Sequence, residues 1–198
     1  VKNAELEVYS FQVNTRYQNA AMHKSECLGQ VPENVQNYYA PAFDELDADM
    51  MQVYMPFMMG SPIESAEQAK EICDQFEAIS KKADALLAAS KKASTLLDDI
   101  TATLASLDAE IANIKKDFPE YDLSAVNESA EYWKNLAAEF AQAPAEGADL
   151  YTEKQIADFA VEFGYFKENV SGVYAQAQKD EWMAQFNAKY YPCLLDTS

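Results

Sequence analysis

Apolar and small residues recur at alternating spacings of four and three along residues 64–117. This spacing is the heptad pattern of a helix that buries one seam against its neighbours. No proline or glycine interrupts the stretch between Ser65 and Asp117, and Pro62 and Pro119 flank it. The pattern predicts one long, coiled-coil-like helix over about residues 64–117. The seam positions are Ile72, Phe76, Ile79, Ala83, Leu86, Ser90, Ala93, Leu97, Ile100, Leu104, Leu107, Ile111, Ile114 and Phe118.

Two shorter apolar stripes precede the long segment and divide residues 1–63 between them. The first covers residues 3–27 with apolar side chains at helical spacing. Pro41 suits the first turn of the second stripe, because a proline there removes no helical hydrogen bond. Pro56 and Gly60 are its expected end. We therefore expect two shorter N-terminal helices that thicken one end of the molecule.

Two further helical segments follow the long one, over residues 124–141 and 152–190. A loop that contains Pro144 separates them. Thr152 and Gln155 have the spacing of a capping box, which predicts a helix start at this point. At ~1.5 Å per residue the two segments together span roughly 85 Å, close to the length of the long helix. We expect them to form a broken return helix that runs antiparallel along the whole long helix.

These elements predict an all-α fold, an elongated antiparallel helical bundle in a single domain over residues 1–198. Residues 1–63 thicken one end, and residues 64–198 form a long helical hairpin. The composition agrees, since 32 alanines favour helix and only five glycines and seven prolines interrupt it. With 49% hydrophobic residues, the chain has enough apolar side chains for a packed core.

The charge balance excludes several kinds of partner. The chain carries 33 acidic against 15 basic residues, a formal net charge of −18, and Arg16 is its one arginine. Phosphate binding needs clustered lysine and arginine, so we expect no nucleic-acid partner. No apolar run approaches the twenty residues of a membrane span. A lipid anchor or a cleaved signal before Val1 stays open.

Few residues are candidates for catalysis or metal binding. His23 is the one histidine and precedes Cys27 by four residues, which we interpret as a coincidence of helical spacing unless a pocket joins them. The acidic stretch 44–49 lacks the glycine turn of a calcium loop and fits a solvated helix face. Neither a Glu-x-x-His pair nor a Cys-x-x-Cys motif occurs. We expect no catalytic residues, no metal and no cofactor, and hence a non-enzymatic protein.

The three cysteines bear on the compartment of the protein. In the antiparallel arrangement the end of the last helix returns to the start of the long one, which makes Cys73 and Cys193 a candidate disulfide. The alternative is three buried or idle thiols. The candidate bridge and the missing initiator methionine favour a location outside the cytoplasm. Glycosylation at the sequons of Asn127 and Asn169 would require a secreted eukaryotic protein.

A cluster of methionines and aromatic residues near the end of the second helix is the candidate partner surface. Its residues cannot all face one interior, and methionine-rich surfaces adapt to varied partners. A poorly packed bundle end is the alternative. The lysine pairs 81–82, 91–92 and 115–116 are interpreted as a solvated face, paired with acids at helical spacing such as Glu77 and Asp84. The candidate surface comprises Met50, Met51, Tyr54, Met55, Phe57, Met58 and Met59.

Two functions are compatible with these features. The first is a non-enzymatic extracytoplasmic helical bundle, at the surface, in the periplasm or secreted, with a binding or structural role. The second is an intracellular coiled-coil adaptor or chaperone-like protein that binds a partner through its methionine-rich end. In both, the expected partner is another protein, and the oligomeric state stays open.

Overall fold

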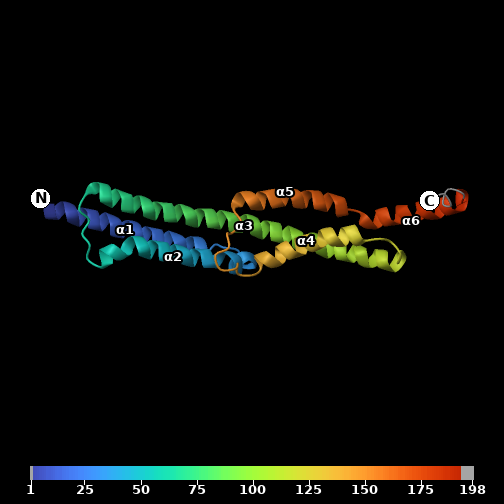
Figure 1. Ribbon diagram of the computed structural model, residues 1–198, viewed down its shortest axis with the longest axis horizontal. Coiled ribbons are helices and arrows are strands. Elements are labelled where there is room, and N and C mark those ends of the chain that lie inside the picture. Colours follow the sequence, from blue (N-terminus) through green and yellow to red (C-terminus); the bar gives the residue numbers. More distant parts are fainter. Residues whose placement is uncertain (1, 193–198) are drawn as a thin grey trace. The chain divides into compact units, whose positions relative to one another are not determined.

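The computed structural model describes residues 2–192, with side chains from residue 4 onward, and is shown in Figure 1. Within these residues the chain is helical with no strand, which confirms the all-α prediction. The elements are α1 (Lys2–Leu28), a 3-10 turn η1 (Glu33–Val35), α2 (Gln36–Met58), α3 (Ala66–Asp117), α4 (Ser124–Phe140), α5 (Glu153–Val170) and α6 (Val173–Tyr190).

The long helix is where the heptad pattern predicts it, since α3 runs without a break from Ala66 to Asp117. The second helix differs at its start. α2 begins at Gln36 and contains both Pro41 and Pro56. η1 leads directly into α2, so the first residues of α2 precede Pro41. Because proline has no backbone N–H, one hydrogen bond within the helix is missing at Pro41. The proline therefore lies inside the helix and does not mark its first turn.

The described chain divides into two compact units that share α3. Unit 1 comprises Val1–Thr95 and Glu139–Ala157, and unit 2 comprises Leu96–Ala138 and Asp158–Ser198. The prediction of one domain over residues 1–198 stays a prediction.

In unit 1, α1 and α2 lie beside the first part of α3 (Figure 1). α1 runs antiparallel to α2, as the pairs Tyr17–Met51 and Lys24–Asp47 indicate. It runs parallel to α3, because His23 meets Asp84, and Gln30, just past the end of α1, meets Lys91 further along α3. The largest fully buried side chains of this unit are Tyr38, Tyr39, Phe43, Phe76, Phe140, Ile156, Val13 and Val35.

The core of unit 2 is built from large apolar residues. Ile100, Leu107 and Ile114 of α3 are buried. Trp133 of α4 packs edge-on against Phe163 of α5, with ring centroids 4.9 Å apart. α4 runs antiparallel to α3, since the hairpin after Asp117 brings Lys134 to Asp108.

The direction of the last two helices corrects one part of the predicted topology. The segment 152–190 was expected to continue the antiparallel return, but it runs parallel to α3. Lys167 contacts Asp99, and Tyr174 further along contacts Glu110 and Asp117. The physical reason lies in the loop between α4 and α5, which turns the chain around at Gly147, whose φ is +75°. Matching segment lengths could not detect that reversal.

Candidate functional site

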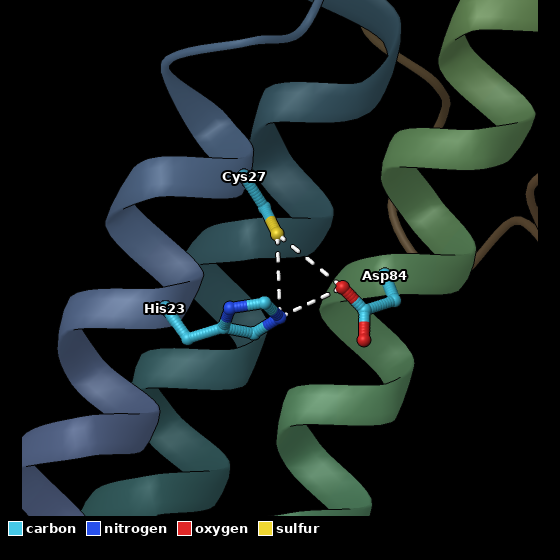
Figure 2. A group of neighbouring side chains, drawn as sticks. All are labelled: His23, Cys27 and Asp84. Atoms are coloured by element: carbon cyan, nitrogen blue, oxygen red, sulfur yellow. Dashed lines mark hydrogen bonds and ion pairs between the residues drawn. The ribbon is translucent and has the colours of Figure 1, made fainter.

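Three side chains from two helices of unit 1 converge on one point, as Figure 2 shows. His23 and Cys27 stand one turn apart on α1, and Asp84 faces them from α3. The Nε2 atom of His23 lies 2.7 Å from Oδ1 of Asp84 and 3.6 Å from Sγ of Cys27. Sγ of Cys27 lies 3.8 Å from the same Oδ1 atom. Cys27 is buried, whereas His23 is partly exposed and Asp84 is exposed, so the cluster opens to solvent on one side.

This geometry does not suit nucleophilic catalysis. A relay from cysteine through histidine to a carboxylate uses both ring nitrogens, one toward each partner. Here the single Nε2 atom of His23 faces both Cys27 and Asp84. Burial, and then the nearby Asp84 carboxylate, raise the pKa of the Cys27 thiol above its usual range. A reactive thiolate needs the opposite shift.

The sequence analysis did not connect Asp84 with His23 and Cys27. The spacing of His23 and Cys27 was visible in the sequence, but Asp84 lies 57 residues beyond Cys27. One signal was present, because Asp84 directly follows the seam residue Ala83. A residue beside a buried seam position lies at the rim of the helix interface. The register between α1 and α3 was needed to name its partner.

A groove of about 980 Å³ lies elsewhere in unit 1, between α2, α3 and the loop before α5. Leu46, Ala85 and Leu86 contribute apolar surface to it. Two ion pairs lie at its rim, Asp49–Lys82 at 3.1 Å and Lys92–Glu153 at 2.7 Å. An apolar floor with polar groups at the edge is typical of small-ligand sites.

The loop wall of this groove is anchored on α2. The Tyr151 backbone N–H donates to the Tyr38 hydroxyl at 3.2 Å, and the Tyr39 hydroxyl donates to the Tyr151 carbonyl at 3.4 Å. The Asn37 side chain donates to the carbonyl of Ala141 at 3.3 Å. Burial raises the pKa of both tyrosines. These bonds hold the loop in place beside the groove.

Only part of the candidate partner surface is exposed in the structure. Met50 is buried, and Tyr54 is half-buried because its ring stacks on Tyr17 at 4.1 Å and its hydroxyl donates to Asn14. Met51 and Phe57 are also half-buried. The exposed members are Met55, Met58 and Met59, whose exposed fractions are 45%, 61% and 80%, respectively.

The structure does not test the cysteine prediction. Cys73 lies half-buried on α3, and Cys193 lies outside the described residues. The pairing of Cys73 with Cys193 therefore stays a prediction.

A second exposed apolar face lies on α6 in unit 2. Trp182, Phe186 and Tyr190 form a row with successive ring centroids 5.4 and 4.7 Å apart. All three side chains are exposed. Ala177 is the last buried residue of α6, and the aromatic residues that follow it do not continue the apolar spacing of the preceding segment.

Lysines of the pairs 81–82 and 91–92 form ion pairs both within α3 and with other elements. Lys81 does pair with Glu77 at 3.0 Å, four residues away. Lys82 and Lys92 instead reach other elements, at Asp49 and Glu153. Asp84 also differs from the expectation, because its side chain contacts His23 and Cys27.

Comparison with protein-family models, with curated proteins and with solved structures found no match to this chain. Among the described residues, no helix combines the length and the apolar character needed to cross a membrane.

Proposed function

We propose that this chain is a non-enzymatic binding protein that holds an apolar segment of a protein partner. The observation that carries the proposal is the exposure of Met55, Met58 and Met59 at the end of α2. Monomeric proteins rarely leave several large apolar side chains together at the surface unless the surface binds something. Methionine suits such a role, because its unbranched side chain adapts to the shape of a partner.

Neighbouring features of unit 1 extend this surface. A pocket of about 370 Å³ lies between α1 and the end of α2, lined in part by Phe11, Tyr54 and Phe57. Phe11 is 71% exposed, the largest exposed fraction among the aromatic side chains described. An apolar side chain of the partner would enter this pocket, while the three methionines cover the residues on either side of it.

The charge of the region defines the partner further. Residues 36–64 contain five acids, Asp44, Glu45, Asp47, Asp49 and Glu64, and neither lysine nor arginine. Lys24 pairs with Asp47 and Lys82 pairs with Asp49, so the proposed attraction rests on Asp44, Glu45 and Glu64. Opposite charge around an apolar contact steers association and selects the partner. The partner proposed here is therefore an amphipathic segment with apolar residues on one face and lysine or arginine at its edges.

The experiment uses a labelled amphipathic peptide of leucine and lysine and measures its fluorescence anisotropy with the full chain. We expect saturable binding that Met58→Gln with Met59→Gln weakens at least about tenfold. Met22→Gln is the matched control, because Met22 is 59% exposed on α1 and lies outside the candidate surface. A peptide with glutamate in place of lysine should not bind.

Two outcomes would contradict the proposed surface. Equal weakening by Met22→Gln would mean that the peptide binds exposed methionines without a specific site. If the double variant bound the peptide as the wild type does and Phe186→Gln lost binding, the peptide would bind to α6.

A location outside the cytoplasm is part of the same proposal, and it rests on the candidate disulfide between Cys73 and Cys193. Intact mass measured with and without reductant, on protein isolated under thiol-blocking conditions, tests it. A mass lower by two hydrogens before reduction, mapped to Cys73 and Cys193, is expected. Three blocked thiols would instead favour the intracellular adaptor.

A further inference from the structure

We infer that His23, Cys27 and Asp84 form a binding site for a divalent transition-metal ion of the zinc class. Each residue offers one ligand atom, and the three atoms lie within 4.8 Å of one another. They are an imidazole nitrogen, a sulfur and a carboxylate oxygen, which together are the donors that zinc prefers. Calcium and magnesium take oxygen ligands only, so this donor set selects against them.

The distances fit a tetrahedral ion with one adjustment. Metal–ligand bonds of about 2.0–2.3 Å at tetrahedral angles place the ligand atoms about 3.3–3.6 Å apart. The observed separation of Cys27 Sγ from His23 Nε2 is 3.6 Å, and that of Cys27 Sγ from Asp84 Oδ1 is 3.8 Å. The contact between His23 Nε2 and Asp84 Oδ1, at 2.7 Å, is a hydrogen bond and must open by about half an ångström. Asp84 is exposed, so its carboxylate can move that far.

The positions of the ligands on the helices favour a preformed chelate. His23 and Cys27 are separated by one turn of α1, which places both side chains on the same face. Asp84 completes the site from α3, so a bound ion would link the two helices within unit 1. Because His23 is partly exposed and Asp84 is exposed, solvent reaches the site, and a water molecule would supply the fourth ligand.

The charge of the site also suits a dication. With a thiolate, a carboxylate and a neutral imidazole, the ligands carry two negative charges, which the ion neutralises. Lys24, the nearest lysine along α1, is already paired with Asp47 at 2.8 Å. The net charge of the chain, −18, raises the local concentration of cations around it. The inference does not depend on the proposed partner surface, which involves other residues.

Cobalt(II) is the probe for the experiment, because its spectrum reports both the donor and the geometry. We expect the reduced full chain to bind one cobalt ion, with a thiolate-to-cobalt charge-transfer band in the near ultraviolet. Intense d–d bands of a tetrahedral ion should accompany it. Addition of zinc should remove both sets of bands, and zinc should raise the melting temperature of the protein.

Three variants and one matched control assign the site. Cys27→Ser should abolish the charge-transfer band, and His23→Gln and Asp84→Asn should each weaken cobalt binding at least about tenfold. Because Cys27 is buried, circular dichroism must show that its variant is folded, whereas the other two sites are open enough to tolerate substitution. The control is the double variant Cys73→Ser with Asp74→Asn, which removes a thiol and a carboxylate elsewhere on α3.

Several results would overturn the inference. The inference would fail if the reduced wild-type chain bound no cobalt at millimolar concentration. Binding that survives both His23→Gln and Asp84→Asn would show that these side chains are not ligands. Loss of the charge-transfer band in the Cys73 control would place the metal at Cys73, and bands of octahedral intensity would exclude the proposed tetrahedral site.

Discussion

The two halves of α3 continue one heptad seam but build it from different residues. Over residues 83–93, in unit 1, the fully buried seam positions are Ala83, Ser90 and Ala93, whereas in unit 2 they include Ile100 and Ile114; nearer the start of α3 the seam of unit 1 is bulky, since Phe76 is also buried. The spacing is the same in both halves, so the difference lies in side-chain volume. Helix axes approach more closely where the residues between them are small.

The contacts between helices beside the small seam residues also differ from those beside the bulky ones. Beside the small residues of unit 1, polar side chains reach from helix to helix, as in His23–Asp84 at 2.7 Å and Lys82–Asp49 at 3.1 Å. Beside the bulky seam of unit 2, Trp133 packs against Phe163, and the ion pair Lys167–Asp99 also links two helices. The candidate metal site and the large groove both belong to unit 1. Both candidate sites therefore lie beside the stretch of α3 in which the seam residues are small.

Removal of volume from unit 2 should have the largest effect. Trp133→Ala deletes a side chain that is 5% exposed and contacts Phe163 and Phe166. The expected loss is about 3–5 kcal/mol of unfolding free energy, because the cavity cannot fully collapse. Urea unfolding followed by circular dichroism measures it. Tyr165→Ala is the control, since Tyr165 is 64% exposed on α5.

Addition of volume to unit 1 should have the next largest effect. Ala83 is fully buried in the seam, so Ala83→Leu forces neighbouring helices apart at a cost of about 1–3 kcal/mol. Ala102→Leu, at an exposed position on the same helix, should change stability by less than about 0.5 kcal/mol. The same urea experiment compares them. A neutral Ala83→Leu would mean that the small seam is loosely packed, which would remove the contrast between the two halves.

The buried seam of α3 could be predicted from residue spacing. Every predicted seam position from Ile72 to Ile114 is buried except Leu86, which is half-buried where α3 lines the groove. The capping box was also predicted, and it is present: the Gln155 N–H donates to the Thr152 hydroxyl at 3.2 Å, and the Thr152 N–H donates to Gln155 at 2.9 Å. Such features depend on residues within a few turns of one helix, which is why the sequence contains them.

The candidate site and the chain reversal depend on contacts between distant residues. A heptad seam is compatible with several registers between α1 and α3, and only one of them brings Asp84 to His23 and Cys27. The direction of α5 depends on a loop that Tyr38 and Tyr39 anchor through Tyr151. Neither contact leaves a local pattern, so both required the structure.

The buried tyrosines of unit 1 should give the protein a pH dependence in the alkaline range. Burial raises the pKa of Tyr39 above its ordinary value of about 10. Above that pH the unfolded chain releases the proton while the folded chain retains it, so stability falls as the pH rises. The loss attributable to one tyrosine reaches about 1.4 kcal/mol per pH unit.

Tyr39→Phe tests this dependence with little structural change, since it removes one hydrogen bond of 3.4 Å. Urea midpoints at about pH 8 and about pH 11, where the unfolded tyrosine is ionised, should differ less in the variant than in the wild type. Tyr165→Phe, at an exposed hydroxyl of unit 2, should leave the wild-type difference intact. If both variants behave as the wild type does, Tyr39 does not contribute to alkaline unfolding.

The smallest expected effects belong to the ion pairs, and they test whether the polar contacts of unit 1 are energetically special. Lys92–Glu153 in unit 1 and Lys167–Asp99 in unit 2 both have a shortest separation of 2.7 Å, and their side chains are similarly exposed, at 49% and 49% against 43% and 46%. Exposed pairs contribute about 0.2–1 kcal/mol, which salt reduces. Double-mutant cycles with Lys→Met and the matching amide should therefore give equal coupling energies in the two units. A coupling well above 1 kcal/mol for Lys92–Glu153 alone would mean that the groove shields its rim from solvent. In that case the polar contacts of unit 1 would stabilise the fold as well as shape its candidate sites.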